Sequence, residues 1–199
     1  MVTITDCSNL NSYETIGGCY SQRAIETGNV SECDRLNEKN EHFVAVVSNE
    51  LKEVPDLNLS TAIEMARINC YAEFSFHAKN LSLCTDNFQN ESLTFCVLKY
   101  ALSEDNVSVC LQLPAKERDE CYGAFAMDKN DSSYCNGLTE RVDRLVCYMA
   151  FAQTENDTSV CDKLPNPDEQ SLCRNYLNGS ICDLYPTAEE QDKCRKQLT

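Results

Sequence analysis

The 199-residue chain carries fourteen cysteines at nearly regular intervals. Their successive spacings are 12, 14, 37, 14, 12, 14, 11, 14, 12, 14, 12, 9 and 12 residues. Apart from one long interruption and one short step, spacings near 12 alternate with spacings near 14, and the period is about 26 residues. Such a period is typical of repeat proteins, so we divide the chain into seven repeat units.

Each repeat unit holds a first cysteine, A, and a second cysteine, B. The A set is Cys7, Cys33, Cys84, Cys110, Cys135, Cys161 and Cys182, and the B set is Cys19, Cys70, Cys96, Cys121, Cys147, Cys173 and Cys194. Leucine follows A by three residues in five units, tyrosine follows B directly in four, and alanine follows B by five residues in four. Cysteine and leucine at this spacing share one face of a helix. The pattern predicts an all-α fold of about seven disulfide-stapled helical hairpins, stacked as a solenoid-like array in a single repeat domain, residues 1–199.

The cysteines are predicted to form disulfides and not metal or redox sites. No two of them are closer than nine positions, and the only histidines are His42 and His77. Metal sites and redox motifs need clustered ligands such as C-x2-C. We therefore expect no metal, no cofactor, and folding in an oxidising compartment.

Two pairing schemes are compatible with the spacing. If A pairs with B inside a unit, the two cysteines lie at the same height of a helical hairpin, within the Cα–Cα reach of about 4.4–6.8 Å. If B pairs with the next A, a helix would separate them by roughly 13 Å or more, and two cysteines would have no partner. The first scheme is preferred, and it predicts Cys7–Cys19, Cys33–Cys70, Cys84–Cys96, Cys110–Cys121, Cys135–Cys147, Cys161–Cys173 and Cys182–Cys194.

The long interruption predicts a helical insertion or a degenerate repeat at residues 37–62. Phe43, Val44, Val47, Leu51 and Val54 lie on one helical stripe that ends at Pro55. This stripe either packs onto the core or forms a partner site at helix 41–54, where Phe43, Val47 and Leu51 would contact the partner protein. In the degenerate-repeat interpretation, Ala45 stands where a B cysteine would be.

Most units begin with a polar phrase such as NVSEC or NDSSYC, which is typical of a helix N-cap. The same phrases contain N-x-[ST] sequons, which predict N-glycosylation on an exposed surface. The candidate asparagines are Asn29, Asn58, Asn80, Asn90, Asn106, Asn130, Asn156 and Asn178. Helix capping alone would also favour these residue types, but Asn58 and Asn90 form sequons outside the common register.

The chain is strongly acidic, with 32 acidic and 17 basic residues and a net charge of -15. This charge argues against nucleic acid as a partner, and no apolar run is long enough for direct membrane insertion. No signal peptide is visible, so we expect that an export signal or anchor has been removed and that Met1 was added. No catalytic, phosphate-binding or EF-hand motif is present, and we expect no enzymatic activity.

The pattern [DN]-x-S-x-C…L…C-Y…A resembles cysteine-rich helical repeats of uncharacterised secreted or membrane-anchored proteins, many of them archaeal. The resemblance spans nearly the whole chain except 36–69. It implies an extracellular location and a stapled helical fold.

The sequence thus leads to two functional expectations. The first is a non-enzymatic structural or scaffold protein, extracellular or on the cell surface, that assembles with itself or with a protein partner. The alternative is a monomeric secreted binding module that uses helix 41–54.

Overall fold

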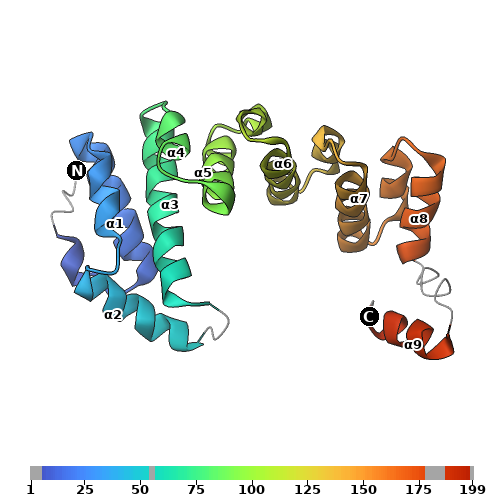
Figure 1. Cartoon of the computed structure of the whole chain (residues 1–199), viewed down its shortest axis with the longest axis horizontal. Coiled ribbons are helices and arrows are strands. Elements are labelled where there is room, and N and C mark those ends of the chain that lie inside the picture. Colours follow the sequence, from blue (N-terminus) through green and yellow to red (C-terminus); the bar gives the residue numbers. More distant parts are fainter. Residues whose placement is uncertain (1–5, 54–56, 178–186, 198–199) are drawn as a thin grey trace. The chain divides into compact units, whose positions relative to one another are not determined.

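The computed structural model describes residues 6–53, 57–177 and 187–197, and every regular element in those ranges is a helix (Figure 1). The all-helical prediction is therefore confirmed for the described residues. The chain divides into two compact lobes, lobe 1 with residues 1–117 and lobe 2 with residues 118–199. Each lobe is described on its own.

Lobe 1 is built on three long helices and several short ones. Its elements are η1 (Cys7–Asn9), α1 (Tyr13–Thr27), η2 (Val30–Arg35), α2 (Glu41–Glu50), η3 (Leu51–Glu53), α3 (Leu59–His77), α4 (Ser82–Thr85), α5 (Asn90–Ser103) and η4 (Val107–Gln112), where η denotes a 3-10 helix. Helix α3 packs between α1 and α5, and α2 lies across the ends of α1 and α3 (Figure 1). The interruption in the repeat therefore adds a helix against the first two long helices.

Lobe 2 continues the same alternation of short and long helices. Its elements are α6 (Ala115–Lys129, which begins in lobe 1), η5 (Ser132–Gly137), α7 (Arg141–Glu155), η6 (Thr158–Lys163), α8 (Pro167–Leu177) and α9 (Ala188–Gln197). Its core is formed by side chains that recur in the repeat, including Leu138, Tyr148, Ala152 and Leu164. All four are at most 3% exposed.

The long helices end in a recurrent left-handed residue, five positions before the next A cysteine. The residues are Gly28, Lys79, Asp105, Asn130 and Asn156, with φ between 50° and 64°. The amide of the following residue donates to a carbonyl five positions back, for example Asn106 to Ala101 at 2.9 Å and Asp157 to Ala152 at 3.0 Å. This is the Schellman arrangement, which satisfies an orphan carbonyl and reverses the chain.

The acceptor of that bond is the small residue found five positions after each of the first five B cysteines. The residues are Ala24, Ser75, Ala101, Ala126 and Ala152, and all are 0% exposed. A larger side chain would have to be accommodated inside a tightly packed chain reversal. The recurrent alanine therefore marks where one unit folds back into the next.

Among the described residues, the A cysteines lie in the short helices and the B cysteines lie in the longer ones. Five disulfides join A to B within one unit: Cys7–Cys19, Cys33–Cys70, Cys84–Cys96, Cys135–Cys147 and Cys161–Cys173, with Cα–Cα distances of 5.6–5.9 Å. These pairs match the preferred pairing scheme. Cys110 and Cys121 are also disulfide-bonded. Cys182 lies outside the described residues, and the side chain of Cys194 in α9 is not described.

Candidate functional site

The most repeated surface feature is the polar turn that begins a short helix. In three units of lobe 1 the turn starts with a sequon asparagine, Asn29, Asn80 or Asn106. The side-chain oxygen of Asn106 accepts from the amide of Ser108 at 3.1 Å and from its hydroxyl at 2.6 Å. Asn29 and Asn80 make the same pair of bonds to the serine two positions on. The capping predicted from the sequence is therefore present at all three.

In lobe 2 the same turn is built with aspartate, and the sequon moves by one residue. Asp131 and Asp157 accept from the amides of Ser133 and Ser159 at 2.9 and 2.8 Å. The sequon asparagines Asn130 and Asn156 precede these aspartates and are the left-handed residues that end α6 and α7. At these turns the sequon asparagine of lobe 1 is the helix cap. In lobe 2 it stands one position earlier and is the left-handed residue that ends the preceding long helix.

All seven described sequon asparagines are exposed. Asn58 caps α3 by accepting from the Thr61 amide at 2.9 Å, and Asn90 begins α5 with a φ of 51°. Asn178 lies outside the described residues. Where the asparagine is a cap, its carbonyl oxygen is the acceptor, so a glycan on the side-chain nitrogen leaves the cap in place. Glycosylation itself stays a prediction.

The ionised form of the carboxyl group is favoured at the aspartate caps because the carboxylate accepts hydrogen bonds. The backbone amide and then the hydroxyl of Ser133 lower the pKa of Asp131, and Ser159 lowers the pKa of Asp157 in the same order. Aspartate and asparagine therefore serve the same capping purpose at neutral pH, and only asparagine offers an acceptor nitrogen for a glycan.

A polar side-chain contact runs beside the disulfide in three units, and in two of them it uses the tyrosine that follows the B cysteine. The hydroxyl of Tyr71 donates to Asp34 at 3.0 Å, and the hydroxyl of Tyr148 donates to Asn136 at 2.9 Å. In each pair the partners follow the B and A cysteines directly. The unit of Cys161 and Cys173 has Asp162 and Arg174 at these two positions, and they form an ion pair. In these three units the short and the long helix are thus joined twice, once by the disulfide and once by a polar side-chain contact.

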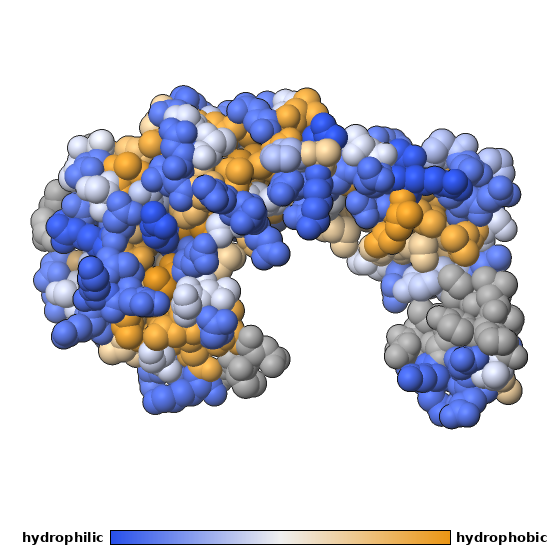
Figure 2. Space-filling model, in the orientation of Figure 1, coloured by the Kyte–Doolittle hydropathy of each residue, from blue (hydrophilic) through white to orange (hydrophobic). Residues whose placement is uncertain are grey.

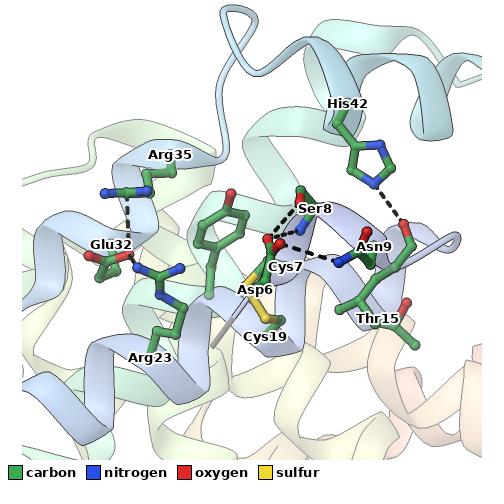
Figure 3. Close-up of a disulfide and its surroundings, with 12 residues drawn as sticks. Asp6, Cys7, Ser8, Asn9, Thr15, Cys19, Arg23, Glu32, Arg35 and His42 are labelled. Atoms are coloured by element: carbon green, nitrogen blue, oxygen red, sulfur yellow. Dashed lines mark hydrogen bonds and ion pairs between the residues drawn. A yellow bond between two sulfur atoms is a disulfide. The ribbon is translucent and has the colours of Figure 1, made fainter. Parts of the chain in front are cut away.

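The first disulfide lies among polar contacts from three segments (Figure 3). Asp6 caps the 3-10 helix of Cys7 by accepting from Ser8. Nε2 of His42, from α2, lies 2.7 Å from the carbonyl oxygen of Leu10. This contact gives His42 a structural role.

In the same region, Glu32 lies between two arginines (Figure 3). Its carboxylate is 3.2 Å from both Arg23 of α1 and Arg35 of η2. The contact connects the end of the first long helix with the short helix of the second unit.

Successive hairpins of lobe 2 are also connected through polar side chains, which the sequence analysis did not identify. Asp119 in α6 is 3% exposed and accepts from the amides of Thr139 and Glu140, each at 2.9 Å, at the start of α7. Burial by itself would raise the pKa of Asp119, but these bonds outweigh it and hold the pKa below its usual value. A similar contact joins the next two hairpins, because Arg141 at the start of α7 forms an ion pair with the buried Glu169 of α8.

The insertion helix α2 is a packing element in this structure. Phe43 is 0% and Val47 2% exposed, and Phe43 stacks on Tyr13 of α1 with ring centroids 6.1 Å apart. The predicted partner contacts at Phe43 and Val47 therefore need correction, because an apolar stripe buried against α1 and α3 is not a surface. Leu51 is half-buried, and its partner role stays a prediction. Ala45 is exposed and does not occupy the buried position of a B cysteine.

Other surface features are open or apolar. A polar cleft of about 620 Å³ lies at the start of α5, lined by Arg67, Phe88 and Asn90 among others.

Lobe 2 has an exposed apolar surface on α7, where Val142 is 67% and Val146 56% exposed. Figure 2 shows a hydrophobic patch over α7 and α8. The described residues contain no group of three or more metal-ligating side chains, and no described helix is long and apolar enough to cross a membrane.

Comparisons with protein-family models, with curated proteins and with solved structures found no match to the chain. The functional argument therefore rests on the geometry described above.

Proposed function

We propose that this protein is a non-enzymatic extracellular scaffold, built as a solenoid-like stack of disulfide-stapled hairpins that carries glycans along its unit starts. The observation that carries the proposal is the repeated polar turn with its exposed sequon asparagine. Five of the described sequon asparagines lie at these turns, Asn58 and Asn90 lie at the starts of α3 and α5, and all seven are exposed. A chain that presents the same modifiable group at most of its repeats is suited to a surface layer or a filament.

Disulfides support the extracellular part of this proposal. Six bonds are present in the described part of the chain, with no free cysteine there, and they indicate folding in an oxidising environment. Each hairpin is too small to bury a core alone, so its disulfide and its neighbours stabilise it. Resistance to unfolding outside the cell is what such staples contribute.

The assembly part of the proposal has a candidate surface in Val142 and Val146. Two exposed valines one helical turn apart on α7 give an apolar surface that a second copy of the chain covers in the proposed assembly. The replacement of both by serine removes this surface without touching the core, while serine at the exposed Gln153 and Glu155 of the same helix is a matched control.

The test is made on protein from its native source. Mass spectrometry without reduction should find glycans on the described sequons, and light scattering with electron microscopy should find assemblies that the double valine variant, but not the control, fails to form. Bare asparagines would contradict the glycan-bearing surface, and purely monomeric native protein would contradict the assembly.

The alternative of a monomeric binding module based on helix 41–54 has less support. Its two main apolar residues, Phe43 and Val47, are in the core. A binding role for this helix would have to use its exposed, mainly polar face.

A further inference from the structure

A groove between α1 and α3 has features that the packing of lobe 1 does not require. We propose that it binds a lysine side chain from a basic segment of a partner protein. The groove has a volume of about 170 Å³, and its small lining residues are Gly17, Gly18, Ser21 and Ala66. The proposal concerns lobe 1 alone and does not rest on the scaffold function.

The glycine pair is the first argument. Gly17 and Gly18 lie inside α1, where each glycine destabilises a helix by about 1 kcal/mol relative to alanine. A Cβ added at either position would meet no atom within 4 Å. Packing between α1 and α3 therefore does not need glycine, and methyl groups at these positions would extend into open space beside the groove.

The second argument is Ser21, on the same helix. Its side chain is buried, with the residue 2% exposed, and it lines the groove. Its hydroxyl makes no side-chain hydrogen bond within the described part of the chain, and it is not among the fully enclosed polar atoms that lack a partner. A ligand group in the groove that donates or accepts there would give this hydroxyl a partner.

The chemistry of the lining selects a cationic donor. Glu14 and Glu73 line the groove and form no ion pair within the described part of the chain, and Asn69 adds an amide carbonyl. No lysine, arginine or histidine lines this groove. An ammonium group has three donors and no acceptor, so it matches the Ser21 hydroxyl together with the carboxylates.

The size and the charge of the chain select a side chain of another protein. Drug-sized ligands and cofactors occupy sites of about 300–1,000 Å³, which are larger than this groove. A lysine has a methylene stem that can lie over the glycines and Ala66 while its ammonium reaches the polar groups. The net charge of -15 on the chain attracts a basic segment of a partner protein.

The test is a nuclear magnetic resonance titration of the ¹⁵N-labelled protein with N-acetyl-lysine-N-methylamide. N-acetyl-norleucine-N-methylamide, which has the same stem without the ammonium, is the control ligand. We expect saturable shifts at the amides of Gly17, Gly18 and Ser21 with the lysine probe only. Glu73→Gln should weaken binding about two- to fivefold, which is the range of an exposed ion pair.

Glycine variants separate binding from stability. Gly18→Ala should raise the midpoint of thermal unfolding and weaken binding at least tenfold. Gly123→Ala, at another helical glycine with open space, should raise the midpoint of thermal unfolding and leave binding unchanged. Equal shifts with norleucine, equal shifts with calcium chloride alone, shifts spread evenly over the acidic surface, or unchanged binding by Gly18→Ala would each overturn the proposal.

Discussion

Asn106 allows the capping role of a sequon to be measured apart from its glycan. Its side-chain oxygen holds the amide and the hydroxyl of Ser108 at the start of η4. Alanine and aspartate at this position both abolish the sequon, but only alanine abolishes the acceptor. Lobe 2 already uses aspartate in the same register at Asp131 and Asp157.

The expected magnitude follows from the lost bonds. Removal of an N-cap side chain costs about 1 kcal/mol, with a range of about 0.5–2, so Asn106→Ala should destabilise the start of η4 by this amount. Asn106→Asp should be within about 0.5 kcal/mol of the parent at pH 7, because a surface change that keeps its bonds has little effect.

Hydrogen exchange of the Ser108 amide in the unglycosylated protein is the appropriate assay, because it reports the local opening. A loss of 1 kcal/mol raises exchange about fivefold in Asn106→Ala, while the amides of Ser82 and Ser159, in the equivalent turns, serve as unchanged internal references. Unchanged exchange in the alanine variant, or equal increases in both variants, would refute the capping argument.

Acidification adds a second readout to the aspartate variant. By analogy with Asp131 and Asp157, whose pKa values are lowered by the same bonds, the new carboxylate should have a pKa below that of the unfolded chain. Its contribution to stability is then present above the unfolded pKa of about 3.9 and lost as the pH falls through the folded pKa. The parent asparagine should show no such loss at this turn.

Three further predictions concern lobe 2. Tyr148→Phe removes a buried hydroxyl with its hydrogen bond and should lower the free energy of unfolding by about 1 kcal/mol at pH 7; since burial raises the pKa of Tyr148, the parent should also lose stability as the pH rises above about 10, and a smaller loss in the variant, measured by urea unfolding, would confirm it. Ala152→Leu should destabilise by about 1–3 kcal/mol because the site is fully buried, whereas the half-buried Ala150→Leu should have a clearly smaller effect on thermal unfolding. Replacement of both Cys161 and Cys173 by alanine opens a loop with a sequence separation of 12 and should cost about 3 kcal/mol; a loss below 1 kcal/mol in denaturant unfolding would contradict the staple argument.

The cysteine spacing determined much of the local architecture by itself. Spacings of about 12 place A and B at one height of a hairpin only if both segments are helical, so composition and period predicted the all-helical fold and the pairing scheme. The polar phrases likewise predicted the helix caps, because a cap is a contact between residues two or three positions apart in the chain. Local interactions of this kind can be read from a chain.

The tertiary structure decided which side of each pattern faces inward. The stripe of Phe43 and Val47 has the same periodicity whether it is core or surface, and only the position of α2 across α1 and α3 shows that it is core. The recurrent tyrosine and alanine were visible in the sequence, but their reasons were not. The structure shows these reasons as the bond from Tyr148 to Asn136 across one hairpin and the chain reversal at Ala152.

The polar contacts between hairpins are made by residues that do not recur at one position of the sequence repeat. Asp119 and Glu169 stand at different positions of their units, yet each is buried against the start of α7. The groove over Gly17 and Gly18 likewise depends on where α3 lies beside α1. Spacing determines which residues share a turn or a hairpin, because those distances are set by the covalent chain and helix geometry. Burial and pockets depend on how separate helices pack, and this is why only the folded structure decided them.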